Sequence, residues 1–242
     1  MARLLQSLAA VCAVASGSAA LAAAPTCRAE SGALLAPVIE LYTSEGCSSC
    51  PPADRWLSTL KPVAANGRAV VQAFHVSYWD YIGWVDRFAS PAHTDRQRRI
   101  ASLNGRSGIY TPQLVRNGQD WRDYERALDG TEAARATIAL RKTSDDAFEA
   151  MVTPVQGVGA WAAYWTVTEH GHSSKVKAGE NAGELLQHDF VVRQYVPAGE
   201  YRGASTVTLR AVAGQPAHAR QVNLVVFDPK TGKPLQALSL GC

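Results

Sequence analysis

The sequence predicts an α/β fold followed by an appended, sandwich-like antiparallel β domain, and three observations lead to this prediction. Residues 37–44 and 69–77 read as buried apolar strands on either side of a helical stretch at 53–61, which makes a βαβ unit with a parallel strand pair. A Cys-Ser-Ser-Cys sequence lies between the first strand and the helix. After about residue 144, short strand-like stretches alternate with Gly and Pro turns, which is typical of an antiparallel β domain.

The first helices are indicated by periodicity and by turn residues. In the first helical stretch, Trp56, Leu57 and Leu60 recur at helical spacing. Residues 78–90 are irregular and aromatic. A second helix is predicted over 91–103, because its first residue is a proline, which is favoured in the first turn of a helix.

Two strands and a third helix complete the first half of the chain. Residues 109–115 read as a strand, the Asn-Gly pair at 117–118 indicates a tight hairpin, and a short strand returns over 119–121. Residues 123–142 have an Ala-rich face, which predicts a long helix. The strand-like stretches of the second half are 147–153, 160–169, 187–196, 205–212, 220–227 and 235–240.

The N-terminal segment has the pattern of an export signal. Arg3 precedes an uncharged stretch rich in Ala and Leu that ends in the small residues 22–24, so residues 1–24 are predicted to be a signal peptide. The mature chain then divides into an α/β domain over 37–143 and a β-rich domain over 146–242. We therefore expect the protein to be periplasmic or secreted.

The composition excludes nucleic-acid binding and stable insertion into a membrane. Apolar residues make up 47% of the chain and charged residues 19%, which favours a packed globular protein. The formal net charge is +3 and the charges are scattered, so the sequence lacks the dense basic stripe that nucleic acid requires. No long apolar run follows the first 25 residues, which excludes stable membrane insertion after signal cleavage.

The cysteines are expected to pair. Signal cleavage near residue 24 removes one of the five cysteines and leaves Cys27, Cys47, Cys50 and Cys242, which are expected to form disulfides in an oxidising compartment. Three pairings exist in principle, and spacing favours Cys47–Cys50, which leaves Cys27–Cys242. Cleavage after Ala29 would instead remove Cys27 and leave Cys242 alone.

The Cys-Ser-Ser-Cys sequence carries the chemistry. Between a strand and a helix start, the Cys47 sulfur would face the positive end of the helix dipole, which stabilises a thiolate and makes Cys47 the nucleophile. Cys50 would lie deeper and close the disulfide. Pro51 and Pro52 fit the first helical turn, where a missing N–H costs little.

The order of elements is similar to that of the thioredoxin fold: strand, CxxC helix, strand, helix, Xaa-Pro strand, hairpin strand and helix. In that fold the proline is cis and packs against the disulfide. The resemblance therefore implies a cis Thr111–Pro112 bond. It also implies that Pro112 shapes a substrate groove to which Thr111 presents its backbone.

Several runs of residues carry a closer resemblance. Residues 40–54, 74–84 and 110–113 resemble the secreted thioredoxin-like family named domain of unknown function 1223. Residues 179–183 and 188–189 are similar to the C-terminal segment of that family. The resemblance implies a thioredoxin-like domain with an appended β domain. It implies no established substrate, because the family is named for its unknown function.

Three roles for the cysteine pair stay open: redox exchange, a structural disulfide and a metal site. Copper is conceivable if His75 approaches Cys47 and Cys50, because Cys and His ligands suit copper. Thioredoxin-like copper chaperones typically have three residues between the cysteines, whereas this chain has two. Glu45, Asp54 and His75 are candidate modulators of the pair; His75 also fits a half-buried histidine bonded to backbone.

The expected activity is that of a thiol–disulfide oxidoreductase that needs no dissociable cofactor. Cys47 forms a mixed disulfide with a protein partner and Cys50 resolves it. Ser48-Ser49 do not distinguish oxidation, reduction and isomerisation. The alternative is a binding module, or a copper-handling protein, whose CxxC is a structural or metal-ligand pair.

Overall fold

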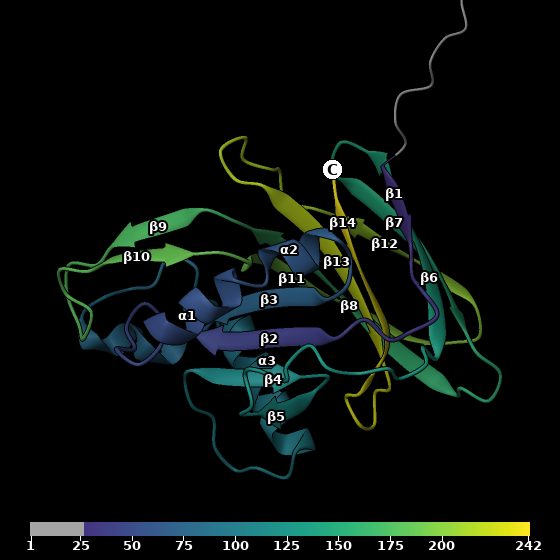
Figure 1. The fold of residues 1–242 in the computed structure, drawn as a ribbon, viewed down its shortest axis with the longest axis horizontal. Coiled ribbons are helices and arrows are strands. Elements are labelled where there is room, and N and C mark those ends of the chain that lie inside the picture. The colour runs from purple at the N-terminus through teal and green to yellow at the C-terminus, as the bar shows by residue number, and fades with distance from the viewer. Residues whose placement is uncertain (1–26) are drawn as a thin grey trace, which may run out of the picture.

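The structure, a computed structural model, describes residues 27–242. The predicted signal peptide at residues 1–24 lies outside the described residues. In the described part of the chain, 43% of the residues are in strands and 15% in helices, so the fold is mostly β. Figure 1 shows that one large sheet runs through the molecule.

This sheet contains eight strands in the order β14-β13-β8-β11-β3-β2-β4-β5. The central strands β2 and β3 are parallel, and β11 adds to β3 in parallel through a single register pair, whereas the other neighbours are antiparallel. The strands are β2 (Val38–Thr43), β3 (Val70–His75), β4 (Gln113–Arg116), β5 (Gln119–Trp121), β8 (Ala160–Glu169), β11 (Val191–Arg202), β13 (Arg220–Phe227) and β14 (Pro234–Gly241).

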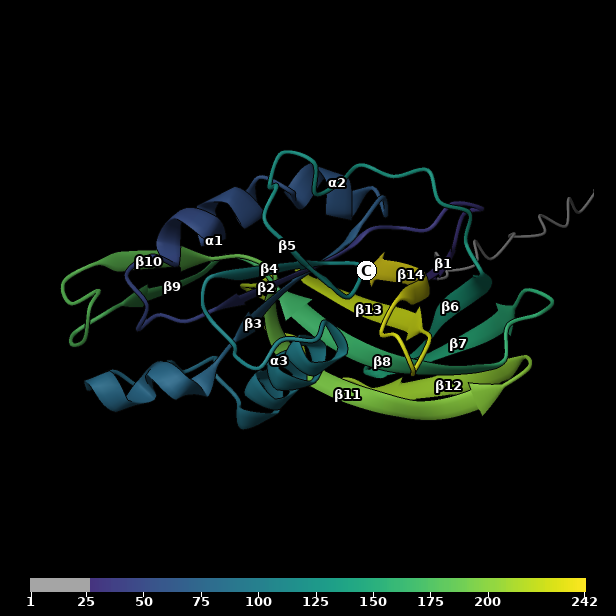
Figure 2. The same cartoon turned by 90° about the horizontal axis from the view of Figure 1, so that it is seen from below.

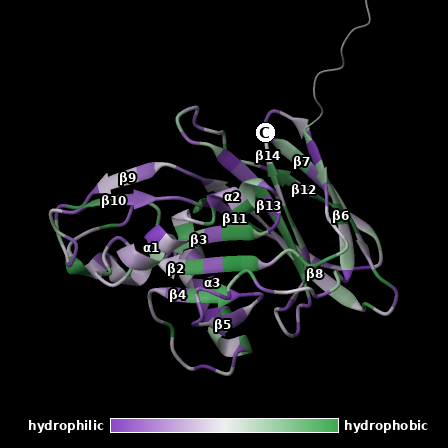
Figure 3. Cartoon of the chain, viewed as in Figure 1, coloured by the Kyte–Doolittle hydropathy of each residue, from purple (hydrophilic) through white to green (hydrophobic). Residues whose placement is uncertain are grey.

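Helices cover both faces of the first half of this sheet. Helices α1 (Pro51–Ser58) and α2 (Lys61–Ala65) lie on one face, and α3 (Pro91–Leu103) lies on the other after the 3-10 helix η1 (Ser77–Ile82) (Figure 2). Strand β2 serves both faces, because Ile39 and Leu41 pack toward α1 while Tyr42 packs toward α3. Figure 3 shows the resulting apolar residues along β2, β3 and β4.

A second sheet packs against the half of the eight-stranded sheet that the helices do not cover. Its strands are β1 (Arg28–Glu30), β6 (Ala136–Ser144), β7 (Ala147–Pro154) and β12 (Ser205–Arg210), in the order β1-β6-β7-β12. Trp161 and Trp165 of β8 are fully buried between the two sheets, together with Leu140 and Val152. A separate two-stranded hairpin, β9 (His172–Lys175) and β10 (Leu185–His188), projects beside α1; residues 172–188 are called the arm below (Figure 1).

The predicted fold class, an α/β thioredoxin-like domain with an appended antiparallel domain, is wrong. The predicted βαβ unit exists, but β11, β8, β13 and β14 extend its sheet, and strands dominate the chain. Local periodicity identified β8, β13 and β14, whereas the strand predicted at 187–196 covers parts of both β10 and β11. Periodicity carries no information on which distant strand each one pairs with. The predicted boundary at 143–146 falls in the β6–β7 hairpin, and the division into two domains stays a prediction.

The predicted helix over 123–142 is also wrong. Residues 136–144 form β6, in which Ala136, Ile138 and Leu140 are buried and alternate with exposed neighbours. That period of two is the signature of a strand with one buried face. The Ala-rich composition favoured a helix, and packing of β6 against β7 and β1 outweighed that propensity.

Two local predictions are confirmed. The Thr111–Pro112 bond is cis. Asn117 and Gly118 both have positive φ, 48° and 75°, as a tight hairpin turn requires, and they join β4 to β5.

The predicted second disulfide is also present. Cys27 and Cys242 are joined with their Cα atoms 6.0 Å apart, which ties the start of the described chain to its end. Among residues 27–242, no helix is both long enough and apolar enough to cross a membrane. These features are compatible with an exported protein.

Candidate functional site

The Cys47–Cys50 disulfide connects the end of β2 to the start of α1. The two Cα atoms are 5.4 Å apart, and Cys50 is the N-terminal cap residue of α1. The carbonyl of Cys50 accepts the N–H groups of Ala53 and Asp54, while Pro51 and Pro52 occupy the first turn. The sequence therefore starts the helix directly at the second cysteine.

Both cysteines are buried, which differs from the prediction of an accessible Cys47 and a deeper Cys50. Cys47 is 1% exposed and Cys50 is 0% exposed. The Cys47 sulfur lies 3.3 Å from the hydroxyl of Ser49. The local sequence does not explain this burial, because segments distant in the chain surround residues 44–50, which join β2 to α1 and are called the cysteine loop below.

One of these segments is the tip of the arm. The Asn181 side-chain amide donates to the carbonyls of Glu45 and Cys47, at 2.8 and 3.0 Å. The Glu180 carboxylate accepts the N–H of Ser48 at 2.9 Å. Sequence reasoning treated these residues only as a hairpin loop, and their similarity to a family segment was the one signal that marked them.

The other segment is η1. Trp79 donates its indole N–H to the hydroxyl of Thr111 at 2.7 Å. A Cβ atom at Gly46 would lie 3.0 Å from the Cβ of Trp79, so any side chain at this position next to Cys47 would require Trp79 to shift. The Trp79 side chain therefore connects the segment before Pro112 with the cysteine loop.

Buried charged residues lie next to the cysteine loop. His75 ends β3, and its Nδ1 atom lies 2.7 Å from Oδ2 of Asp86. The same carboxylate accepts the N–H of Glu45 at 2.9 Å. Nε2 of His188 lies 3.2 Å from Oε1 of Glu45, close enough for an ion pair, although the two atoms are not aligned as a hydrogen bond.

Two of the carboxyl groups in this cluster are held ionised. Burial alone would raise the pKa of Asp86, but the charge and contact of His75 outweigh burial and lower this pKa to about 2. Burial would also raise the pKa of Glu45, but the contact with His188 and other polar contacts lower it. Burial would lower the pKa of His75, and the Asp86 carboxylate instead raises it.

Asp54 behaves differently. It follows Cys50 by four residues and therefore lies on the same face of α1. Burial raises its pKa, and the charges of His188 and His75 and the hydroxyl of Thr43 offset this only in part. The pKa of the Asp54 carboxyl therefore lies above its ordinary value, whereas the pKa values of Asp86 and Glu45 lie below theirs.

The residues predicted for the copper alternative, Cys47, Cys50 and His75, do not form a ligand set in this structure. The Cys47 and Cys50 sulfurs are bonded to each other, and His75 contacts Asp86. Across residues 27–242, no three or more His, Cys, Asp or Glu side chains are grouped to hold a metal ion.

The fold and the site define a mostly β protein that has a buried CxxC disulfide at the end of a central strand. Residues 38–227 match the family described as protein of unknown function DUF1223, and the chain belongs to that family. A comparison with curated proteins found no match.

Two solved structures are similar. Protein AGR_C_4864 from Agrobacterium tumefaciens is 26% identical, with a TM-score of 0.67, over 87% of this chain and 96% of that one. HBP35 of Porphyromonas gingivalis is 12% identical, with a TM-score of 0.59, over 86% of this chain and 75% of that one, and this similarity concerns the fold alone.

The contact of Glu180 with Ser48 leads to a prediction. Glu180→Gln keeps an acceptor for the Ser48 N–H but removes a negative charge beside Cys47, which favours the reduced, thiolate-forming state. We expect the reduction potential of the disulfide to rise, by less than the ~30 mV that a tenfold change in equilibrium would require, because water screens this exposed carboxylate. Equilibration with glutathione buffers measures the shift in reduction potential.

The control variant is Glu184→Gln, because Glu184 is an exposed acid in the same loop. This variant should shift the reduction potential less than Glu180→Gln. An equal shift would remove the specific role of Glu180.

Proposed function

We propose that the protein exchanges disulfides with thiols or disulfides of partner proteins through Cys47 and Cys50. The observation that carries this proposal is the pair itself, which lies at the start of α1 beside the carboxyl of Asp54, whose pKa burial raises. A helix N-terminus stabilises a thiolate, and a protonatable group beside the second cysteine supports its release.

The exchange conserves atoms and electrons. A partner thiolate attacks the Cys47 sulfur, which forms a mixed disulfide and breaks the Cys47–Cys50 bond. Cys50 leaves as a thiolate and takes up a proton, which the carboxyl of Asp54, four residues on in α1, can relay. A second partner thiolate then attacks the partner sulfur of the mixed disulfide, which releases Cys47. The partner gains a disulfide and this protein becomes a dithiol; the reverse sequence reduces a partner.

The remaining predicted residues have supporting roles in this proposal. Thr111 and Pro112 border the groove in which the partner chain lies. Glu45 and His75 set the charge around the cysteine loop through Asp86 and His188. Because both sulfurs are buried, a protein partner requires the arm tip or η1 to move before it reaches Cys47.

Burial of the pair also favours a second candidate, a binding module in which Cys47–Cys50 is a structural disulfide. An exchange enzyme has a labile disulfide, whereas a structural one resists reduction, with a potential below about −300 mV. We further propose that the protein acts in the periplasm or outside the cell, because its two disulfides persist in oxidising compartments.

Trapping distinguishes the two candidates. In the exchange mechanism, Cys50→Ser leaves Cys47 joined to its partners in mixed disulfides that reduction releases, and Cys47→Ser collects at least tenfold fewer. Non-reducing gels of the exported protein measure both. If both variants collect no partners and lose stability equally, the disulfide is structural and the exchange proposal is rejected.

A further inference from the structure

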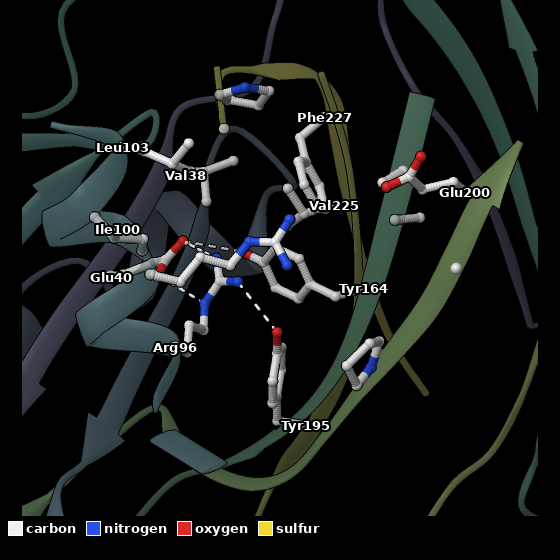
Figure 4. A pocket seen from close by; sticks show the side chains of 18 residues that line it. Val38, Glu40, Arg96, Ile100, Leu103, Tyr164, Tyr195, Glu200, Val225 and Phe227 are labelled. Carbon is white, nitrogen blue, oxygen red and sulfur yellow. Dashed lines mark hydrogen bonds and ion pairs between the residues drawn. The ribbon is translucent and has the colours of Figure 1, made fainter. Parts of the chain in front are cut away.

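A separate cavity of about 190 Å³ lies between α3 and the central sheet. Its lining comes from α3, the start of β2, strands β8, β11, β13 and β14, and the turn residues Gly118 and Gly232. It shares no residue with the cysteine loop (Figure 4). The proposed exchange reaction makes no use of it. An inference about this cavity therefore stands apart from the proposed function.

The walls of the cavity are mainly apolar. They include Val38, Ile100, Leu103, Val225 and Phe227. An apolar cavity of about 150 Å³ is large enough to bind benzene. The volume and the walls therefore fit one aromatic ring that carries a small substituent.

The polar groups of the cavity centre on a buried ion pair. Arg96 donates to Glu40 through Nη2 and Nε, at 2.6 and 3.0 Å. The hydroxyls of Tyr42 and Tyr164 donate to the same carboxylate, at 2.8 and 3.0 Å. Glu40 therefore has four donors and little capacity to accept a hydrogen bond from a ligand.

Arg96, in contrast, keeps unused donors. A guanidinium has five N–H groups, of which two go to Glu40 and one goes to the Tyr195 hydroxyl at 3.3 Å. Only 10% of the Arg96 side chain is exposed, and its guanidinium carbon lies 3.9 Å from the centre of the Tyr164 ring. Two N–H donors of this nearly buried cation therefore have no acceptor among residues 27–242, and Arg96 lines the cavity.

The lining holds two arginines and two acids, so an anionic acceptor is favoured by the local donors of Arg96 rather than by the net charge. Arg99 also lines the cavity, and within residues 27–242 this arginine forms no ion pair. The other acid of the lining is Glu200, which Figure 4 shows apart from Arg96. Charge-assisted hydrogen bonds from a guanidinium to a carboxylate are stronger than those to a neutral group.

We propose that this cavity binds a small aromatic monocarboxylate, with the carboxylate on the free N–H groups of Arg96 and the ring between the apolar walls. The rings of Tyr164, Tyr195 and Phe227 line the site and add aromatic contacts to the ligand. The recognition element is thus a cation whose position Glu40 and the tyrosines hold before the ligand arrives.

Calorimetric titration of the full chain with benzoate tests the proposal, with benzyl alcohol as a neutral ligand of similar size. We expect saturable binding of one benzoate per chain and at least tenfold weaker binding of benzyl alcohol. Absence of saturable benzoate binding overturns the proposal. Equal binding of the two ligands also overturns it, because the cavity would then recognise only the ring.

A variant at the cavity rim localises the binding. Leu103 is 37% exposed, so Leu103→Trp should fill the entrance without removing a partner of Arg96, and should weaken benzoate binding at least tenfold. Leu185→Trp is the matched control, because Leu185 is 62% exposed and lies in the arm. Thermal unfolding checks that both variants are folded. Unchanged binding by Leu103→Trp, or an equal loss in both variants, places the ligand elsewhere and overturns the proposal.

Discussion

Replacing Arg96 by methionine is expected to lower the free energy of unfolding by about 3–5 kcal/mol, because it leaves the Glu40 carboxylate buried without its cation. The methionine fills much of the volume of the arginine stem, so the loss arises mainly from the uncompensated charge. The hydroxyls of Tyr42 and Tyr164 still donate to Glu40, but neutral donors do not replace a guanidinium. Urea unfolding followed by circular dichroism measures the change.

Two further variants separate this effect from a general effect on α3. Arg98→Met removes an exposed arginine whose ion pair with Asp95 is in solvent, and should change stability by at most about 0.5 kcal/mol. Adding Glu40→Gln to Arg96→Met removes the buried charge and should recover part of the loss. If Glu40→Gln lowers the free energy of unfolding in the Arg96→Met background as much as it does in the wild-type protein, the two residues act independently. The ion-pair argument is then wrong.

Several local elements of the fold could be predicted from the sequence, although strand β6 was mistaken for part of a helix. Helix α3 begins at Pro91 and ends at Leu103 as predicted, and β8 and β13 have the predicted bounds. Periodicity, proline and turn residues act over a few positions, so they are visible in a single sequence. The order of strands in the sheet is not visible in a single sequence, because the parallel pairing of Val191 with Ala73 joins positions more than a hundred residues apart.

The candidate site was predictable to a similar extent. The positions of Cys47 and Cys50 relative to β2 and α1 follow from local pattern. Their burial does not, because Asn181 and Trp79 reach the cysteine loop from the arm and from η1. A single sequence contains no physical signal that connects those segments.

The buried ion pair of Asp86 and His75 also lacks a signal in the sequence, although eleven residues separate the two positions. The Asp86 carboxylate accepts the N–H of Glu45 as well as that of Phe88, so it connects the segment after η1 with the cysteine loop. All of its contacts are with donors. An asparagine at this position would turn its amide N–H₂ toward one of those donors.

We therefore expect Asp86→Asn to lower the free energy of unfolding by about 3–5 kcal/mol near pH 6, where the pair of Asp86 and His75 contributes most. Asp95→Asn on the exposed surface of α3 is the matched control and should cost at most about 0.5 kcal/mol. Urea unfolding of the three proteins at one pH gives both values. A loss of less than 1 kcal/mol in Asp86→Asn would show that the pair does not hold the segment in place.

The pH dependence of the same variant provides an independent test. The pKa of Asp86 is about 2 in the folded state and about 3.9 when unfolded, so its contribution of about 2–3 kcal/mol is present above pH 4 and is lost as the pH falls from 4 to 2. The pKa of His75 is raised on folding, so its contribution is present below about pH 6.5 and is lost as the pH rises through the folded-state value. Stability of the wild-type protein should therefore fall at both ends of this range. The profile of Asp86→Asn should be flatter at both ends, because removal of the carboxylate abolishes the contribution of Asp86 and the main cause of the raised His75 pKa. A variant profile parallel to that of the wild type would assign the pH dependence to other groups.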